Sequence, residues 1–240
     1  MINALIIIPT YNEIENIEAL VVEVLGQSSS LARFETLVVD DASSDGTGKV
    51  VERLAERDVR VHLLSRPAKL GLGTAYIAGF RYALDHGYEM VGTMDADFSH
   101  PPSYLPSFAQ AMAHADVVIG SRYVRGGGVR NWGVHRRLLS AGANVLARFV
   151  GGLKPRDCTT GYRLYRTAFL RKLDLDSITS HGYSCLIELV YACQHAGAKI
   201  VESPIIFVDR RAGQSKISRK EIVKAFATLY RLACRRWRQD

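Results

Sequence analysis

The chain has 240 residues, of which 48% are hydrophobic, and a formal net charge of +7. No stretch reaches the ~18 uninterrupted apolar residues of a membrane span, and residues 4–8 already form an apolar run, so no export signal is expected. The cysteines at positions 158, 185, 193 and 234 have neither metal-ligand spacing nor a dense disulfide pattern, so we expect reduced cytosolic thiols.

The charge is distributed unevenly. Residues 1–120 carry 8 Lys and Arg against 16 Asp and Glu, a net charge of −8, whereas residues 121–240 carry 23 against 8, a net charge of +15. The basic half is therefore expected to meet something anionic, for which nucleic acid, lipid phosphate and an anionic bilayer all qualify.

Apolar runs and helical patterns alternate through the first half. Strands are predicted at residues 4–8, 36–39, 61–64, 88–93 and 117–119. Amphipathic helices are predicted between them, within residues 14–25, 50–55, 75–83 and 105–112. This alternation indicates βαβ units and a mainly parallel sheet covered by helices on both faces. The carboxyl ends of the strands then offer polar loops to a nucleotide.

Several short patterns lie in the loops between these elements. Asn12 and Glu15 have the spacing of a capping box ahead of the first helix. Gly71 and Gly73 make no dinucleotide fingerprint, because a third glycine is missing and no strand directly precedes them. The Gly-Lys-Ser/Thr end of a phosphate-binding loop is also absent, which argues against a P-loop NTPase.

Asp95 and Asp97 follow the strand predicted at residues 88–93. Alternate residues of an extended chain face opposite ways, so the two carboxylates converge only if the chain turns there, and Pro101-Pro102 favours a turn. Hard oxygen ligands of this kind suit Mg²⁺ or Mn²⁺ carrying a substrate diphosphate. A solvated turn is the alternative interpretation.

The second half opens with a glycine-rich basic loop at residues 125–130, followed by a long helical pattern. Its apolar positions between Leu138 and Val150 fit a core helix, but the flanking arginines also fit a helix at a membrane surface. Arg136 and Ser140 are four residues apart and therefore share one face of this helix.

Further elements are expected towards the end of the chain. Strands are predicted at residues 162–165, 200–201 and 205–208, and a helix at 184–196. A polar loop spans residues 209–216. The closing segment, residues 220–238, either docks on the core or presents its Trp and Arg side chains to anionic lipid.

Seven motifs stand in one order along the chain. Those of the first half are Pro9-Thr10-Tyr11-Asn12-Glu13, Asp40-Asp41-x-Ser43-x-Asp45-Gly46-Thr47, Lys69-x-Gly71-Leu72-Gly73-Thr74-Ala75-Tyr76 and Met94-Asp95-Ala96-Asp97-x-Ser99-His100-x-Pro102. Together they resemble inverting glycosyltransferases of the GT-A type. The later motifs are Gly120-Ser121-Arg122-Tyr123, Arg136-Arg137-x-x-Ser140 and Phe207-x-x-Arg210-x-x-Gly213-x-Ser215-Lys216. With them the chain is similar to the dolichyl-phosphate (polyprenyl-phosphate) mannosyltransferases from residue 5 to about residue 220.

The resemblance implies a GT-A nucleotide-sugar-binding fold and a reaction. Mannose would pass from GDP-mannose to a polyprenyl or dolichyl phosphate with inversion, which leaves GDP. Residues 1–240 would form a single catalytic domain, with donor binding in 1–120, acceptor binding in 121–220 and a basic amphipathic helix in 220–240. A phosphate oxygen is already anionic at neutral pH, so the nucleophile needs orientation more than a strong base.

The resemblance also implies roles for individual residues. The donor-binding residues would be Pro9, Tyr11, Glu13, Val39, Asp41, Asp95, Ala96, Asp97, Arg122, Arg210 and Lys216. Asp97 and Asp95 would hold the metal, Mg²⁺ or Mn²⁺. Arg122, Arg136 and Ser140 would bind the acceptor phosphate. Asp95, Asp97 and Arg122 would be the catalytic residues.

The chain departs from the family at Cys185-Leu186, where Phe-Gln is usual, so a pocket wall would differ. Longer relatives carry transmembrane segments after this domain. The resemblance therefore implies a cytoplasmic enzyme at the cytoplasmic face of a membrane, brought there by amphipathic surfaces or by a membrane-anchoring partner subunit.

Three alternatives stay open on the sequence alone. The first is an enzyme of the same type that uses UDP-glucose or UDP-N-acetylglucosamine. The second is a nucleic-acid-binding protein whose basic half contacts phosphates, although this leaves Asp95 and Asp97 without a purpose. The third is an inactive family member, which the complete set of charged motif positions disfavours.

Overall fold

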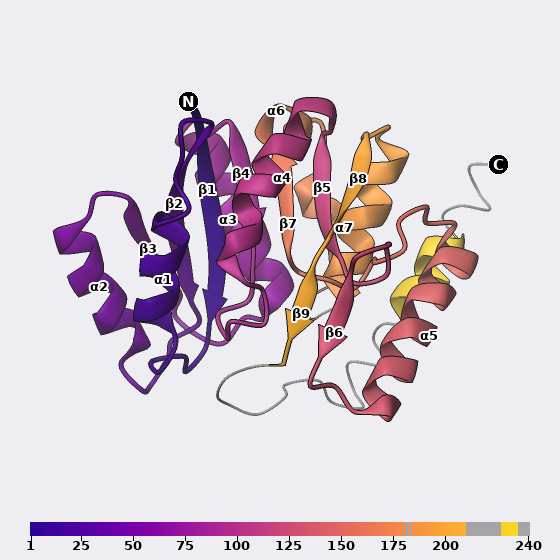
Figure 1. The fold of residues 1–240 in the computed structure, drawn as a ribbon, viewed down its shortest axis with the longest axis horizontal. Helices are drawn as coiled ribbons and strands as arrows, with labels where there is room; N and C mark the ends of the chain where they lie inside the picture. The colour runs from indigo at the N-terminus through magenta and orange to yellow at the C-terminus, as the bar shows by residue number, and fades with distance from the viewer. Residues whose placement is uncertain (181, 183, 210–226, 235–240) are drawn as a thin grey trace.

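The computed structural model describes residues 1–180, 182, 184–209 and 227–234. Its main sheet has seven strands in the order β3-β2-β1-β4-β7-β5-β8, and β6 and β9 pair separately (Figure 1). The strands are β1 (Ile2–Thr10), β2 (Ala32–Asp40), β3 (Val61–Ser65), β4 (Met90–Thr93), β5 (Val117–Ser121), β6 (Gly128–Arg130), β7 (Arg163–Arg166), β8 (Ile200–Pro204) and β9 (Ile206–Val208).

Helices cover both faces of the sheet. They are α1 (Ile17–Leu25), α2 (Thr47–Arg57), α3 (Leu72–Asp85), α4 (Leu105–Ala111), α5 (Val134–Gly151), α6 (Thr167–Leu170) and α7 (Ser184–His195), with short 3-10 turns at Pro102–Tyr104, Met112–His114 and Leu175–Ser177. Alternate side chains of β1 point to opposite faces of the sheet and pack against the helices on each face. Ile6 and Ile8 pack with residues of α1, α2 and α4, while Leu5 and Ile7 pack with residues of α3 and α7.

The sequence therefore predicted the α/β class and the mainly parallel sheet correctly, apart from one strand. β7 runs antiparallel to both of its neighbours, β4 and β5. Its first residue, Arg163, pairs with Thr93 and Ile119, which lie near the carboxyl ends of those strands. The chain thus enters β7 from the carboxyl edge of the sheet, so the segment just before β7 reaches the same edge as the ends of β1, β2 and β4.

The sequence missed the second sheet. Residues 128–130 were expected to be loop, but they form β6, which pairs in parallel with β9 (Val129 with Phe207). This small sheet connects the start of α5 to the end of β9. It therefore brings residues 122–140 and 207–209 together, although some 70 residues separate them in the chain.

Helix α5 is not a core helix along its whole apolar stripe. Val134, Leu138, Val145 and Phe149 are 72%, 69%, 63% and 86% exposed, whereas the polar residue Asn144 is buried. Among the residues that the structure describes, no helix is long and apolar enough to cross a membrane.

Part of the closing segment is described, and it docks on the core. Residues 227–234 are helical, with Leu229 and Leu232 buried in the same apolar cluster as α3 and α7. Arg231 forms an ion pair of 2.9 Å with Glu188, which is 1% exposed. Residues 220–226 and 235–240 of the predicted membrane helix lie outside the described ranges.

Candidate active site at the carboxyl edge of the sheet

Three turns at the carboxyl edge of the sheet carry an unusual backbone conformation. Asn12, Ala42 and Phe98, which follow β1, β2 and β4, have φ angles of 55°, 54° and 61°. Such conformations cost about 1–3 kcal/mol each for residues other than glycine and cluster at functional sites. The capping-box interpretation of Asn12 was wrong. Its Oδ1 accepts a hydrogen bond from the Ser44 backbone N–H at 3.0 Å, and α1 begins later, at Ile17.

Asp40, at the end of β2, shapes this edge. Its carboxylate accepts hydrogen bonds from the Thr10 hydroxyl at 2.8 Å, the Ser43 hydroxyl at 2.6 Å and the Ser43 N–H at 3.0 Å. These bonds tie the turn after β2 to the end of β1. Asp40 therefore serves as a scaffold for the residues beside it.

Asp41 belongs to a different network. It accepts hydrogen bonds from Arg66 and from the Gly71 N–H, and Arg66 also donates to the Thr74 hydroxyl at 2.8 Å and the Gly71 carbonyl at 3.1 Å. Sequence reasoning missed Arg66. Arg66 could have been found from its position, because it is the first residue after β3 and therefore lies at the same edge of the sheet as Asp41.

The other predicted donor residues occupy varied surroundings. The Lys69 ammonium lies 3.7 Å from the centre of the Tyr11 ring. Glu13 is partly exposed, and its carboxylate accepts a hydrogen bond from the Asn16 side chain at 3.2 Å. Pro9 is also partly exposed, but the side chains of Val39 and Ala96 are buried in the core. A ligand would therefore meet the backbone of these last two residues.

Asp95 and Asp97 lie on a turn organised by His100. The His100 Nδ1 accepts a hydrogen bond from the Asp95 N–H at 3.0 Å and lies 3.8 Å from the Asp95 Oδ2. Burial lowers the pKa of His100 to about 3, against the opposing charge of Asp97, so the ring is neutral at physiological pH. Asp97 is buried and accepts a hydrogen bond from the Ser99 N–H at 3.1 Å, while the Asp95 side chain is 28% exposed. The predicted turn is confirmed.

Gly161, two residues before β7, closes this region from the other side. A Cβ at this position would lie 2.9 Å from the Tyr76 hydroxyl oxygen and 3.3 Å from the Asp95 Oδ1. A side chain there would displace the Tyr76 hydroxyl and crowd the Asp95 carboxylate. The tight approach explains why glycine precedes the antiparallel strand.

The residues of this turn fit a divalent cation that is bound partly by the protein and partly by a substrate. In the described parts of the chain, no three His, Cys, Asp or Glu side chains are grouped to hold a metal. Asp95, whose side chain is accessible, lies beside the His100 ring, and the charge of the buried Asp97 acts on the same ring. The Ser99 hydroxyl is buried without a hydrogen-bond partner among the described residues. Mg²⁺ typically takes one or two carboxylates and completes its shell with phosphate oxygens and water.

Arg122, which follows β5, is held in a buried ion pair with Asp157. Its Nε and Nη2 each donate to the Asp157 carboxylate at 2.7 Å, and its backbone N–H donates to the same carboxylate at 3.0 Å. Burial disfavours the charged form of both side chains, but their mutual attraction and hydrogen bonds outweigh this effect. The pKa of Arg122 is therefore raised and the pKa of Asp157 is lowered. The charge of Asp95 acts in the same direction on Arg122. Sequence reasoning missed Asp157, 35 residues away.

The start of α5 carries the other predicted phosphate residues. Ser140 accepts a hydrogen bond from the Tyr123 hydroxyl at 2.8 Å. The Arg136 Nη1 donates to the Asp209 carboxylate at 2.8 Å, and its guanidinium carbon lies 4.1 Å from the centre of the Trp132 ring. Trp132 and Asp209 had no role assigned from the sequence.

Phe207 of β9 joins these two parts of the site. Its ring centre lies 5.4 Å from that of His100, 5.1 Å from that of Trp132 and 5.6 Å from the Arg122 guanidinium carbon. The structure thus brings Asp95, Asp97, Arg122, Arg136 and Ser140 to one side of the molecule. Arg210 and Lys216, the remaining predicted residues, lie outside the described ranges.

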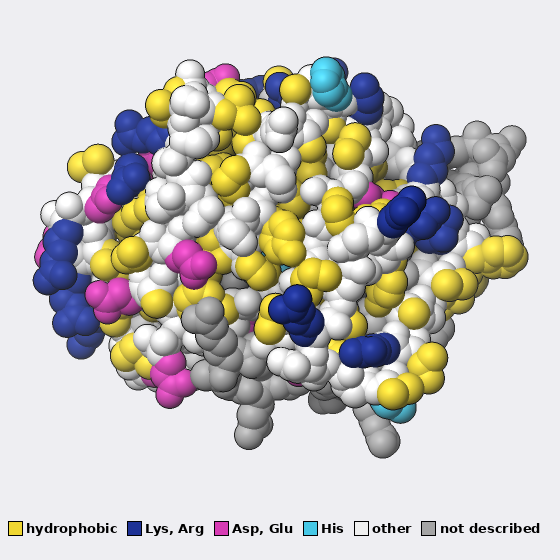
Figure 2. Space-filling view, viewed as in Figure 1, with side chains coloured by type: hydrophobic (Ala, Val, Ile, Leu, Met, Phe, Trp, Pro, Cys, Tyr) yellow, Lys and Arg dark blue, Asp and Glu magenta, His cyan; other side chains and the backbone are white. Residues whose placement is uncertain are grey.

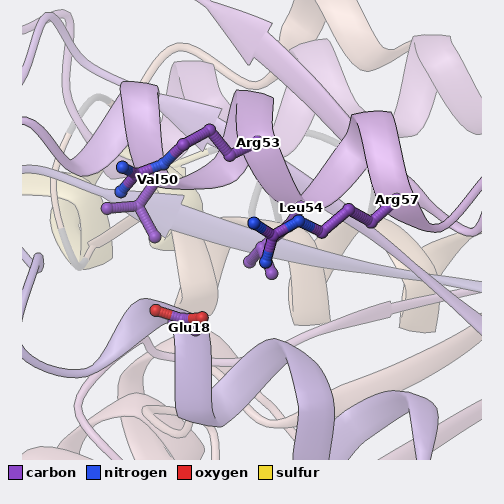
Figure 3. Close-up of a pocket in the computed structure, with 5 residues that line it drawn as sticks. All are labelled: Glu18, Val50, Arg53, Leu54 and Arg57. Atoms are coloured by element: carbon purple, nitrogen blue, oxygen red, sulfur yellow. The ribbon is translucent and has the colours of Figure 1, made fainter.

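A separate pocket of about 260 Å³ lies between α1 and α2 (Figure 3). Arg53 and Arg57 reach over it from one helix, and Glu18 lies across from them on the other. Figure 1 places these helices at the opposite end of the molecule from α5. None of its lining residues is among those predicted for the site.

Comparisons with known proteins place the chain in a known family. The profile of glycosyl transferase family 2 matches residues 5–174. An undecaprenyl-phosphate mannosyltransferase of Micrococcus luteus is 46% identical over 215 residues, which cover 89% of this chain and 87% of that protein. A polyprenol monophosphomannose synthase of Mycolicibacterium smegmatis is 46% identical over 223 residues, which cover 92% of this chain and 83% of that protein.

Solved structures share the fold at low sequence identity. Glucosyl-3-phosphoglycerate synthase of Mycobacterium tuberculosis, in complex with Mn²⁺, UDP and glucosyl-3-phosphoglycerate, aligns with a TM-score of 0.68 at 17% identity over 96% of this chain and 80% of that chain. The same enzyme in complex with Mg²⁺ and UDP aligns with a TM-score of 0.66 at 17% identity, over 96% and 79% of the two chains.

Proposed function

This chain belongs to glycosyl transferase family 2, and we propose that it transfers mannose from GDP-mannose to a polyprenyl phosphate. A phosphate oxygen of the acceptor forms a bond to the anomeric carbon of mannose. The bond from that carbon to the diphosphate breaks, and GDP leaves with the electron pair. The configuration at the anomeric carbon inverts. The identity of 46% to two enzymes named for this reaction, over about nine-tenths of the chain, carries the proposal.

The two sides of the site suit the two substrates. Tyr11, Glu13 and Asp41 lie at the ends of β1 and β2 and serve the nucleoside, together with Pro9 and the backbone of Val39. Asp95, Asp97 and the backbone of Ala96 serve the ribose and diphosphate. Arg122, Arg136 and Ser140 serve the acceptor phosphate. Arg122 also faces the charge of Asp95, so it stands between the two sides and stabilises negative charge that develops on the departing diphosphate.

Asp97 and Asp95 hold Mg²⁺ or Mn²⁺ in this proposal. The cation neutralises the donor diphosphate when it is bound. The buried Asp97 and the accessible Asp95 support this role. The metal-containing structures of the same fold are consistent with it.

The outer face of α5 rests on the membrane surface that contains the lipid acceptor. Val134, Leu138, Val145 and Phe149 are all more than 60% exposed and lie on the helix that carries Arg136 and Ser140. Figure 2 shows hydrophobic side chains along the edge of the molecule formed by α5, with Lys and Arg side chains nearby. A polyprenyl tail leaves a bilayer at a cost of ~0.8 kcal/mol per CH₂, so the phosphate must be reached at the headgroup level. A membrane-anchoring partner subunit would strengthen this contact.

The proposal is tested with purified protein, undecaprenyl phosphate and GDP-mannose labelled in the sugar. Label should appear in the organic phase only when the phosphate acceptor is present.

Asp97→Ala should reduce transfer by about 10²–10³-fold, the cost of one lost transition-state interaction of ~3–4 kcal/mol. If the protein were fully active in the presence of a chelator and the Asp97→Ala variant were unimpaired, Asp97 would not bind a metal that the reaction needs.

A pair of variants tests the assignment of the acceptor side. Arg136→Ala and Ser140→Ala should raise the KM for the polyprenyl phosphate, while calorimetry should show unchanged affinity for GDP-mannose. A loss of donor affinity in these variants would show that the two residues serve the donor instead.

A further inference from the structure

The two arginines of the acceptor side are paired with aspartates in different ways. Asp157 is fully buried and binds Arg122 through two guanidinium nitrogens and the backbone N–H. Asp209 binds Arg136 through Nη1 at 2.8 Å, and the two side chains are 33% and 30% exposed. The first pair is fixed within the protein. The second is accessible to water and to any anion that approaches α5.

The backbone around Asp209 is held independently of this ion pair. The Asp209 N–H donates to the Arg130 carbonyl at 3.3 Å, and the Val208 N–H donates to the Ser99 carbonyl at 3.3 Å. Val208 also pairs with Arg130 between β9 and β6. The Asp209 side chain can therefore leave Arg136 without unfolding the segment that carries it.

Trp132 keeps Arg136 in place if the carboxylate leaves. Its ring lies beneath the Arg136 guanidinium at 4.1 Å, and Trp132 is itself only 7% exposed. Phe207 packs edge-on against the ring with 5.1 Å between the ring centres. An arginine on a buried aromatic ring retains both its orientation and its free N–H donors.

We propose that Asp209 occupies the place of the acceptor phosphate on Arg136. When the acceptor binds, its phosphate displaces the Asp209 carboxylate and takes over the contact with the Arg136 guanidinium. This inference rests on the proposed function and identifies a residue that tunes affinity for the acceptor. A phosphate monoester carries about −1.5 to −2 charges at neutral pH, against one for a carboxylate, so it displaces Asp209 from a partly exposed pair. Before the acceptor arrives, Asp209 keeps Arg136 from binding other anions at a charged surface.

The test removes the charge of Asp209 and keeps its shape. Asp209→Asn should lower the KM for geranyl phosphate, a short water-soluble acceptor, by about two- to fivefold, because the competing pair is an exposed one. The KM for GDP-mannose should not change. Asp209→Ser, which also removes the carboxylate, should act in the same direction. The matched control is Asp176→Asn, which breaks the exposed ion pair with Arg81 and should leave both KM values unchanged.

A merely structural role for Asp209 predicts the opposite sign. If the KM for geranyl phosphate is unchanged or raised in both Asp209 variants while the control behaves as wild type, Asp209 does not compete with the acceptor for Arg136 and the proposal is wrong. Calorimetric titration of geranyl phosphate into the donor-free proteins keeps this result separate from the proposed function. Tighter binding to Asp209→Asn than to wild type supports the exchange even if no mannose is transferred.

Discussion

At the scale of single residues, the site combines fixed charges with exchangeable ones. Asp40, Asp41 and Asp157 accept several hydrogen bonds each from neighbouring turns, and these bonds set the shape of the carboxyl edge. Arg136 instead lies on an aromatic ring, and its side chain is 30% exposed. The fixed charges position the backbone, and the exposed charge is available to a ligand.

Replacing Asp157 should reveal how much stability its fixed pair holds. Asp157→Asn leaves the buried Arg122 without a counter-charge, so the free energy of unfolding should fall by about 3–5 kcal/mol in denaturant titrations. The Arg122→Met, Asp157→Leu double variant should recover much of this loss, because no buried charge remains. If the single and double variants proved equally unstable, the loss would come from packing rather than from the unpaired charge.

The same pair gives a pH dependence. Burial opposes the charge of Asp157, but attraction and hydrogen bonds from Arg122 outweigh it, so the folded-state pKa lies below the ordinary value of 3.8. The unfolded state then takes up the proton first as the pH falls. The contribution to stability is complete above about pH 4 and decreases as the pH drops towards the folded-state pKa. Asp157→Asn should lack this component of the acid transition when unfolding is followed from pH 5 downwards.

Two replacements of Trp132 should separate its ring from its N–H group. Trp132→Leu removes the surface beneath Arg136 and should raise the KM for geranyl phosphate by about 2–30-fold, the range of a cation–π interaction of ~0.5–2 kcal/mol. Trp132→Phe keeps an aromatic ring and should change this KM less. The KM for GDP-mannose serves as the internal control. Equal effects of the two variants would show that the ring face does not hold Arg136.

Sequence reasoning correctly placed the structural features whose signal is local. Asp95 and Asp97 follow a short apolar strand and precede two prolines, so both the edge of the sheet and the turn could be predicted. Asp157 and Asp209 could not be found in this way, because their partners lie 35 and 73 residues away. Only the antiparallel β7 and the β6–β9 pair bring those partners together.

At the scale of elements, β7 and α5 determine where the proposed acceptor side lies. The loop that follows α5 returns to the carboxyl edge before β7 begins, and it delivers Asp157 and Gly161 there. Periodicity predicted the main helices and strands, because their apolar faces repeat over many residues. It missed β6, which has three residues beside a run of glycines, and it could not decide which face of α5 is buried.

A charge on the outer face of α5 should weaken membrane binding. Burying a side chain as large as Phe contributes about 1.5–3 kcal/mol, so Phe149→Asp should reduce partitioning onto anionic vesicles by about tenfold or more. Val59→Asp is the matched control, since Val59 is 81% exposed in the turn between α2 and β3. Transfer to geranyl phosphate in solution should be unaffected. Equal vesicle binding by the two variants would exclude α5 as the membrane contact.

At the scale of the whole molecule, the carboxyl edge of one sheet carries both the proposed donor side and the proposed acceptor side. Residues 1–120 carry a net charge of −8 and residues 121–240 a net charge of +15. The exposed apolar stripe lies on the basic side, on the helix that carries two of the proposed phosphate residues. This arrangement suits a small anionic donor that arrives from solution and an anionic lipid that stays in its membrane.

A parallel screen of three donors tests whether the protein transfers mannose from GDP-mannose. Purified protein, undecaprenyl phosphate and Mg²⁺ would be incubated with GDP-mannose, UDP-glucose or UDP-N-acetylglucosamine, each labelled in the sugar, and lipid-linked label would be measured. We predict rapid labelling from GDP-mannose and little from either UDP-sugar. Labelling from a UDP-sugar at a higher kcat/KM than from GDP-mannose, or no labelling from any donor, would contradict the account.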